Sequence, residues 1–388
     1  MDLEKRAAEL EEYVIRLRRE FHQHPELSLQ EDRTVRRIRE ELEQSGIPSQ
    51  IVGRNNVVGV LEGAKPGRRI AIRADIDALP MTELAESPWK STTPGKFHGC
   101  GHDSHAASLI GAAMLLRENP DFNGTVVFLF QPGEEPGVGA KAMIEDGLFE
   151  RFPMQEIYGQ HNKPQLPLGQ IAVRPGKFMS SEDDFWITIH GLGGHASAPH
   201  NTRDPLVTAA EIVLQLQTVI SRSLNPLEAG TISCCDIKTD GVLNAIPSTV
   251  TIIGDCRAYN PAVQDLIESR MCSIVQHVCE MNGCEWELRY DRVFVPVMND
   301  EACVQAVVDA ATKLYGPDMV DPNTPMGSGS EDFAWYQQHI PGAYFNVGTR
   351  PEGAETVYPQ HNARYVFNDD AILYGSEVFT QLVYDRLK

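Results

Sequence analysis

The sequence lacks an excess of positive charge. Its 388 residues include 34 Lys and Arg against 54 Asp and Glu, which gives a formal net charge of −20 at pH 7. Proteins that bind nucleic acids or other polyphosphates need basic patches, and the sequence shows none. We therefore expect no nucleic-acid partner.

The sequence also lacks long apolar runs, and we expect no cleavable leader. No uninterrupted apolar stretch approaches the ~20 residues that a membrane span requires. The stretch MDLEKRAAELEEYVIRLRRE is charged throughout, unlike a signal or transit peptide. The eight cysteines have no disulfide-framework spacing, which is typical of reduced thiols. We expect a cytoplasmic protein without a membrane partner.

The pattern that is present predicts two domains, the larger of α/β type. Apolar residues at helical spacing predict helices near residues 3–21 and 31–45, and the run TVVFLFQ is typical of a strand covered on both faces. Strands that alternate with helices indicate a mixed, mostly parallel sheet covered by helices. We assign residues 1–177 and 291–388 to this discontinuous domain.

Residues 178–290 have a different pattern. The expected order is the strand DFWITIHG, a helix, strands at 230–237 and 248–257, a helix that begins at Asn260-Pro261, and the strand CEWELRY. The order βαββαβ is ferredoxin-like, with one antiparallel sheet and two helices on one of its faces. We expect a smaller domain inserted into the larger one.

The stretch HGCGHDSH, residues 98–105, supports three hypotheses. It is half of a structural zinc site, a Cys100 nucleophile with His102 as its base, or one corner of a catalytic metal centre. A structural zinc site needs a matching second ligand pair, and the chain offers none within reach. A cysteine nucleophile would leave the acidic loop downstream without a role.

That acidic loop is QPGEE, which follows the strand TVVFLF and ends in Glu134 and Glu135. The ends of strands are where α/β folds usually place their chemistry. Adjacent side chains on extended backbone point in opposite directions, so one carboxylate can bind a metal while its neighbour faces the space in front of it. The alternative is a solvated acidic turn.

Two separate histidines complete a possible ligand set. His161 lies at the end of a short predicted strand, and His361 lies in a loop ahead of the last helix. A lone histidine is more often a surface or core residue than a ligand, but both lie where a common cleft of the α/β domain can form. With Cys100, His102 and Glu135 they make five ligands.

Five ligands suit two metal ions if the Cys100 thiolate bridges them. Each ion then has three protein ligands and keeps a position for water, which is the catalytic pattern. Two such ions can share a hydroxide and polarise a carbonyl. Glu134 is then placed to take a proton from the water and deliver it to a leaving amine.

Taken in order, the motifs resemble one branch of a known superfamily nearly end to end. It is the amidohydrolase branch of the aminoacylase and glutamate-carboxypeptidase superfamily, which includes hippurate hydrolases, N-acetyl-amino-acid deacetylases and plant auxin-conjugate hydrolases. The matching fragments are FHQHPELSLQE, RADIDALP, HGCGHDSH, QPGEE, GHASAPH, NAIPSTV, GSEDFAWY and HNARYVFND.

This resemblance implies a catalytic α/β domain interrupted by a lid domain, through which the chain forms a homodimer or a higher homo-oligomer. It implies two divalent metal ions per subunit and Glu134 as the general acid and base. The implied metal ligands are Cys100, His102, Glu135, His161 and His361.

Three aspartates are expected to support the metal site. The wider superfamily has a His-x-Asp where this chain has Asp75-x-Asp77, and the cysteine-containing branch shares that change. We therefore place Asp75 and Asp77 in a supporting position and not on the metal. We expect Asp103 to orient His102.

Three residues of the lid are candidates for contact with the substrate. By the resemblance, His195 stabilises the negative charge that develops on the scissile carbonyl, from the same chain or from the partner subunit of a dimer. Asn244 is a weaker candidate for the same oxygen. Arg257 can pair bidentately with a substrate carboxylate. The alternatives are a plain loop histidine and a surface ion pair.

The sequence therefore predicts a metal-dependent amidohydrolase. Its substrates are expected to be N-acyl-L-amino acids (N-acetyl or hippurate-like), which it splits into a carboxylic acid and an amino acid. A dipeptidase or carboxypeptidase on the same scaffold, or a non-catalytic metal- or ligand-binding protein, are the alternatives. A thiolate ligand favours zinc, cobalt or nickel, whereas carboxylates also tolerate manganese.

Overall fold

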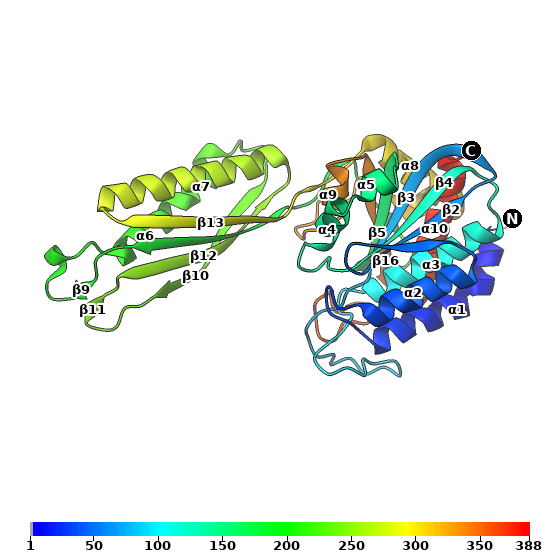
Figure 1. Ribbon diagram of the computed structural model, residues 1–388, viewed down its shortest axis with the longest axis horizontal. Coiled ribbons are helices and arrows are strands. Elements are labelled where there is room, and N and C mark those ends of the chain that lie inside the picture. Colours follow the sequence, from blue (N-terminus) through cyan, green and yellow to red (C-terminus); the bar gives the residue numbers. More distant parts are fainter. Residues whose placement is uncertain (1–2) are drawn as a thin grey trace. The chain divides into compact units, whose positions relative to one another are not determined.

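The computed structural model describes residues 3–388, and the chain divides into two compact units (Figure 1). The first unit comprises the chain up to Phe178, Met298–Pro325 and Asp332–Lys388, and the second comprises Met179–Val297 and Met326–Glu331. The predicted boundary after residue 290 is too early. It falls inside the strand β13 (Glu285–Phe294), whose ladder with β8 (Glu182–His190) continues to Phe294.

An eight-stranded mixed sheet forms the centre of the first unit, in the order β1-β2-β4-β3-β5-β16-β6-β15. The inner strands β4, β3, β5 and β16 pair in parallel, whereas β1 and β2 add an antiparallel edge. This confirms the predicted mixed, mostly parallel sheet. The strands are β1 (Ser49–Val52), β2 (Asn56–Glu62), β3 (Lys65–Asp75), β4 (Asn123–Gln131), β5 (Glu156–Pro167), β6 (Ile171–Ala172), β15 (Val320–Asp321) and β16 (Gly342–Arg350).

Helices cover this sheet. Among them α1 (Leu3–Gln23), α2 (Asp32–Gln44) and α3 (His102–Glu118) lie side by side (Figure 1). The C-terminal helix α10 (Ile372–Arg386) packs against α1, α3 and α8 (Glu301–Tyr315). Further elements include the short helices α4 (Gly139–Glu145), α5 (Leu148–Arg151) and α9 (Ala334–Gln337) and the short strands β7 (Gly176–Met179) and β14 (Val297–Asn299).

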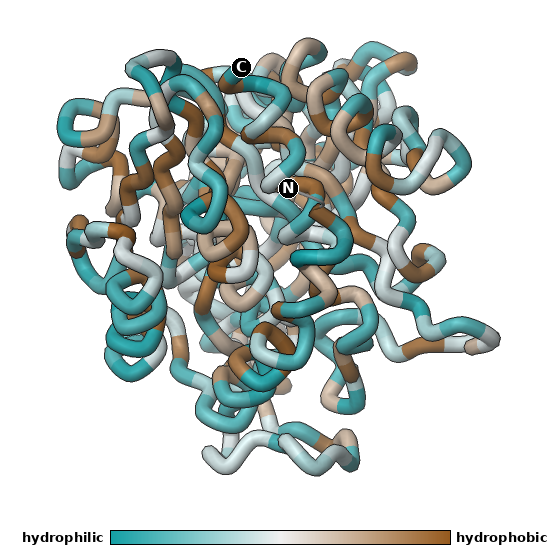
Figure 2. The backbone as a smooth tube through the Cα atoms, turned by 90° about the vertical axis from the view of Figure 1, so that its right-hand side faces the viewer, coloured by the Kyte–Doolittle hydropathy of each residue, from teal (hydrophilic) through white to brown (hydrophobic). Residues whose placement is uncertain are grey.

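The burial of apolar side chains explains why this unit forms a sheet covered by helices. β4 is buried almost throughout, as expected of a strand covered on both faces, and Phe128 and Phe130 belong to one core cluster with Leu109 of α3 and Leu382 of α10. Hydrophilic and hydrophobic stretches are interspersed along the backbone (Figure 2). Within residues 3–388, no helix is both long and apolar enough to cross a membrane.

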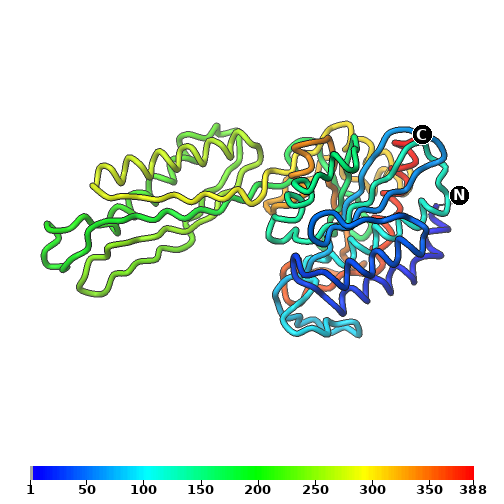
Figure 3. Tube along the Cα trace, viewed as in Figure 1, coloured from blue at the N-terminus to red at the C-terminus, as the bar shows by residue number. Residues whose placement is uncertain are grey.

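The second unit has the predicted ferredoxin-like order. One continuous stretch, green to yellow in Figure 3, forms β8, α6 (Pro205–Thr218), β10 (Gly230–Thr239), β12 (Thr249–Ala258), α7 (Pro261–Asn282) and β13. The four strands make an antiparallel sheet in the order β10-β12-β8-β13. A smaller ribbon pairs β9 (Gly194–His195) with β11 (Ala245–Ile246).

Local sequence signals explain the elements of this unit. The side chain of Asn260 accepts a hydrogen bond from the N–H of Val263 (2.9 Å), so α7 begins where the Asn-Pro pair predicts. Alternate residues of β8 are buried and pack with residues of α6 and α7 in a second hydrophobic core.

A buried carboxyl makes this second unit sensitive to pH. Asp183 of β8 accepts hydrogen bonds from Gln264 Nε2 (2.5 Å) and the Tyr290 hydroxyl (3.0 Å), yet burial raises its pKa to about 6. An unfolded Asp has a pKa of about 3.9, so between these values the folded state holds a proton that the unfolded state releases. Stability from this group is therefore lost as pH rises from about 4 to about 6.

We expect Asp183→Asn to remove this loss. Between pH 4 and pH 7 the wild-type protein should lose about 2–3 kcal/mol of unfolding free energy at this site, and the variant should not. Urea unfolding of both proteins at the two pH values measures the difference. Asp236→Asn, at an exposed position of β10, is the control. An unchanged pH dependence in Asp183→Asn would contradict the assignment.

Candidate functional site

The candidate site lies where the parallel strands β3 and β4 end, next to His161 within the neighbouring parallel strand β5. Asp75, the last residue of β3, is in register with Gln131, the last residue of β4. Asp77 follows β3, and the Glu134–Glu135 pair follows β4. Parallel strands end at the same edge of a sheet, so the topology alone brings these groups together.

The five predicted metal ligands converge there in two groups. Potential ligand atoms of Cys100, His102 and His161 lie within 4.8 Å of one another, and so do those of Cys100, Glu135 and His361. The two groups have Cys100 in common. Individual distances are 3.3 Å from Cys100 Sγ to His161 Nε2 and 3.5 Å from Glu135 Oε2 to His361 Nε2.

His161 does not lie where the sequence suggested. It was expected at the end of a short strand, but β5 is 12 residues long and continues six residues beyond it. His361 has φ +62°, a left-handed conformation that is uncommon outside glycine. Its N–H donates to the carbonyl of Gly99 (2.9 Å), which ties the C-terminal loop to the segment before Cys100.

The orientation of His102 suits a metal ion. Its Nδ1–H donates to Asp77, to the backbone carbonyl at 3.1 Å and to Oδ1 at 3.2 Å. Its Nε2 is buried and has no hydrogen-bond partner among residues 3–388. A buried imidazole that is held at one nitrogen and unsatisfied at the other fits a ligand for a divalent cation.

The protonation states of the other donors agree with this fit. Burial lowers the pKa of His161 well below its ordinary value, with His105 and His102 adding to the shift, and burial also lowers the pKa of His361. Both rings are therefore neutral, the form that binds metals. Burial and the nearby Glu135 raise the pKa of the Cys100 thiol. A divalent cation bound at this position would oppose that shift and favour the thiolate.

The two glutamates lie in a turn and not on extended backbone. The N–H of Gly137 donates to the Glu134 carbonyl (2.7 Å), and both carboxylates lie 4.0 Å from His102 Nε2. The expectation that they point in opposite directions is therefore wrong, because the proline- and glycine-rich sequence bends the chain at this point. Glu135 lies next to His361, so the two carboxylates still have different surroundings.

Asp77 connects several parts of the site. In addition to His102, it accepts hydrogen bonds from the Ser28 hydroxyl (2.6 Å) and the backbone N–H of Glu135 (3.1 Å), both through Oδ2. Burial opposes its charge, but the hydrogen bonds from His102 and Ser28 hold its pKa below the ordinary value. These contacts agree with the predicted supporting position of Asp77.

Asp75 connects to a second buried network. Burial opposes its charge too, but His102, His105 and Arg73 hold its pKa well below the ordinary range. Arg73 Nη1 lies 2.6 Å from Asp75 Oδ2, and Arg73 Nη2 lies 2.6 Å from Asp332 Oδ1. His105 donates through Nδ1 to Asp75 Oδ1 (2.5 Å).

The sequence interpretation missed His105 and Asn162. The N–H of Asn162 donates to His105 Nε2 (3.1 Å), and its side-chain amide donates to the Cys100 carbonyl (2.9 Å). The carbonyl of Asn162 accepts from His161 Nδ1 (2.8 Å) and from Gln360 Nε2 (2.6 Å). Asn162 therefore joins three chain segments that carry candidate ligands.

The prediction for Asp103 is wrong. Asp103 does not orient His102, because adjacent residues in a helix point about 100° apart and Asp103 therefore faces α1. There it accepts from His22 Nδ1 (2.8 Å) and Arg18 Nη1 (3.3 Å). Burial opposes its charge, but His22 holds its pKa well below the ordinary value. Asp103 anchors α3 to α1.

The three predicted substrate contacts all lie in the second unit. His195 is exposed on β9, and the N–H of Ala196 donates to the carbonyl of Asn244 (3.0 Å), which lies in the turn just before β11. The guanidinium of Arg257 lies 2.8 Å from Glu182 and 3.0 Å from Asp255. These contacts favour the ion pair over a substrate site at Arg257.

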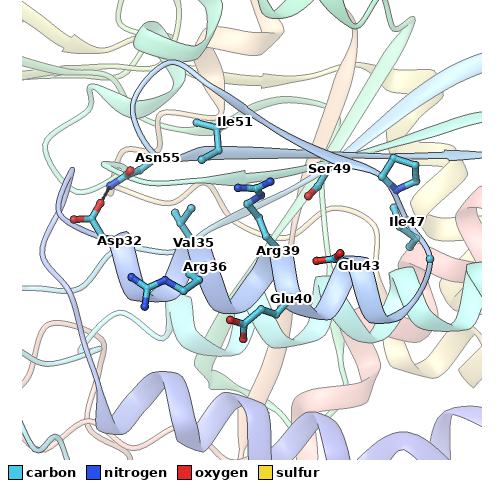
Figure 4. A pocket seen from close by; sticks show the side chains of 12 residues that line it. Asp32, Val35, Arg36, Arg39, Glu40, Glu43, Ile47, Ser49, Ile51 and Asn55 are labelled. Atoms are coloured by element: carbon cyan, nitrogen blue, oxygen red, sulfur yellow. Dashed lines mark hydrogen bonds between the residues drawn. The ribbon is translucent and has the colours of Figure 1, made fainter.

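An open groove of about 960 Å³ lies elsewhere, between α2 and β1 (Figure 4). Its lining includes Arg36, Arg39 and Glu40 of α2 and Ile51 of β1, and no candidate ligand. Because no candidate ligand lines this groove, it is not a site for the proposed metal chemistry.

Comparison with known proteins decides the family. The model described as peptidase family M20/M25/M40 matches residues 71–385. The chain belongs to peptidase family M20/M25/M40. This match covers every candidate ligand and confirms the resemblance that the motifs indicate.

Individual M20 relatives match over nearly the whole chain. N-acetylcysteine deacetylase of Bacillus subtilis is 36% identical over 95% of this chain and 95% of its own length. Thermostable carboxypeptidase 2 of Saccharolobus solfataricus is 36% identical over 95% of this chain and 94% of its own. The crystal structure of the YXEP protein of Bacillus subtilis, described as a dinuclear metal binding peptidase, is 32% identical and covers 98% of this chain and 99% of its own, with a TM-score of 0.85.

These relatives are a deacetylase, a carboxypeptidase and a metal-binding peptidase. They confirm the prediction of a metal-dependent hydrolase that acts on linear amides. The potential ligand groups of this chain agree with metal binding, while the metal itself stays a prediction.

Replacing Asp77 tests its position behind His102. Asp77→Asn keeps the size of the side chain but cannot accept from all three donors. We expect zinc affinity, titrated by calorimetry into chelator-stripped protein, to fall by about 10- to 100-fold. Asp103→Asn is the matched control, expected to lower the melting temperature and leave zinc affinity unchanged. Equal effects of the two substitutions on zinc affinity would contradict this division.

Proposed function

We propose that the protein is a metal-dependent amidohydrolase that cleaves the amide bond of N-acyl-L-amino acids, releasing a carboxylic acid and an amino acid. The observation that carries this proposal is the division of five potential ligands into two groups that share Cys100. Two ions with three protein ligands each would keep positions for water and substrate, which is a catalytic arrangement.

The proposed ligands hold two divalent cations per subunit. Cys100, His102 and His161 would bind one, and Cys100, Glu135 and His361 the other. When bound, the cations supply Lewis-acid polarisation of the acyl carbonyl and lower the pKa of the attacking water. The donor set of one thiolate with imidazoles and a carboxylate is compatible with zinc, cobalt, nickel or manganese.

The protein's own groups would handle the proton and the developing charge. Glu134 would take the proton from the attacking water and deliver it to the nitrogen of the leaving amino acid. His195 would donate a hydrogen bond to the oxygen that becomes negative when the carbonyl is attacked. Asp75 and Asp77 would hold the ligands in position, and Asn244 is a further candidate for the same oxygen.

The name of the deacetylase relative supports a small acyl group as part of the substrate. The carboxypeptidase relative, equally similar to this chain, supports a dipeptidase or carboxypeptidase as the second candidate. A small-molecule substrate, a cytoplasmic location, and a homodimer or higher oligomer formed through the second unit belong to the same proposal.

An assay with refilled protein tests the reaction. Chelator-stripped protein is refilled separately with manganese, zinc, cobalt and nickel and given N-acetyl and N-benzoyl amino acids. Release of free amino acid should disappear with the metal and return with it. Dipeptides are the control substrates. Faster release from dipeptides would favour the peptidase, and no release from any substrate with metal bound would favour a binding protein.

Replacing Glu134 separates hydrolysis from metal binding. Glu134→Gln keeps the side-chain size but cannot accept the proton, so hydrolysis should fall by roughly 10²- to 10⁴-fold. Metal content per chain, measured on the same sample, should stay at the wild-type value. Glu145→Gln, at an exposed position of α4, is the control. Near-wild-type turnover in Glu134→Gln would exclude it as the base.

A further inference from the structure

The backbone around His195 is held in place although its side chain is exposed. β9 pairs with β11, so His195 lies opposite Ala245, and the Leu192–Arg203 pair closes the loop through two hydrogen bonds of 2.9 and 3.0 Å. A Cβ on Gly193 would lie 2.6 Å from the Ile246 carbonyl oxygen, so glycine is required there. These contacts fix the position of the His195 backbone, but they do not determine which ring nitrogen carries the proton.

Ser197 contacts the ring at one nitrogen only. Its backbone N–H donates to His195 Nδ1 at 3.1 Å, and its hydroxyl lies 2.8 Å from the same atom. A backbone N–H is always a donor, so Nδ1 must be the acceptor and carries no proton. A neutral imidazole with an unprotonated Nδ1 has its proton on Nε2.

We propose that Ser197 is a positioning residue that holds His195 in the Nε2–H tautomer, so that the outward nitrogen donates a hydrogen bond and cannot act as a base. The role of that donor in the reaction rests on the proposed amidohydrolase function, whereas the tautomer itself does not. With Nε2 restricted to donation, His195 suits a developing oxyanion, and the proton transfers remain with Glu134.

Substitutions of Ser197 separate this role from a general effect on the turn. Ser197→Ala removes the hydroxyl bond and keeps the backbone donor, so kcat should fall by about 2- to 10-fold, the size of one neutral hydrogen bond. Ser197→Thr keeps both donors and should retain wild-type kcat. Ser197→Asp keeps the backbone N–H but adds an ionised acceptor next to Nδ1. The charge-assisted bond from a protonated Nδ1 to that carboxylate is stronger than the neutral bond from the backbone N–H, so the proton moves to Nδ1 and leaves Nε2 without one.

Histidine tautomers are read directly by nuclear magnetic resonance. The zinc-loaded, full-length protein is labelled with ¹⁵N-histidine, and the ring signals that disappear in His195→Ala are those of His195. Long-range ¹H–¹⁵N correlations at neutral pH should show a proton on Nε2 in the wild type and in Ser197→Thr. In Ser197→Asp they should show a proton on Nδ1.

The kinetic readout uses the best N-acyl amino acid from the substrate assay. In Ser197→Asp, kcat should fall by about 10²- to 10³-fold, close to His195→Ala, with little change in KM. Ser269→Ala, which removes an exposed hydroxyl from α7, is the control. Equal losses of kcat in Ser197→Ala, Ser197→Thr and Ser197→Asp would indicate that Ser197 only shapes the turn, and would overturn the proposal.

The experiments test the proposed tautomer and the proposed activity independently. A proton on Nδ1 in the wild type, or on Nε2 in Ser197→Asp, would overturn the proposal whatever the protein hydrolyses. If the tautomer switches as expected but no acyl amino acid is cleaved, the Ser197–His195 assignment is supported and the proposed function fails.

Discussion

The candidate site depends on the carboxylate of Asp77. This one buried group accepts hydrogen bonds from the ring of His102, the hydroxyl of Ser28 and the backbone of Glu135. Those donors come from three different parts of the chain: the start of α3, the segment after α1, and the turn after β4. A movement of Asp77 would therefore displace a candidate imidazole ligand and a candidate carboxylate ligand together.

Burial explains the electrostatics of the same region. The carboxylates of Asp75 and Asp77 stay ionised because hydrogen bonds and positive groups offset their loss of hydration. His161 and the Cys100 thiol have the opposite balance, since burial keeps both neutral. The result is a set of buried carboxylates close to the donor atoms of His161 and Cys100, an arrangement that favours a cation.

The sequence suggests the candidate ligands because they stand in short motifs, although His161 lies inside β5 and not at the end of a strand as expected. Their binding of metal stays a prediction. The prediction from sequence failed where a contact depends on the direction in which a side chain points. Asp103 is next to His102 in sequence, but one step along a helix turns it toward α1. His105 had a usable signal, since three residues from His102 places it on the same helix face. Asn162 had none, because its role comes from hydrogen bonds between segments far apart in sequence.

Amide hydrolysis needs one group that moves a proton and another that donates to the oxyanion without losing its own proton. A single group doing both would change charge in the middle of the reaction. In this chain the two proposed groups belong to separate units, and each is held by bonds inside its own unit. Glu134 lies in a turn closed by Gly137, and His195 is held by Ser197. The tautomer of His195 is thus set by the backbone N–H and hydroxyl of Ser197, both inside its own unit.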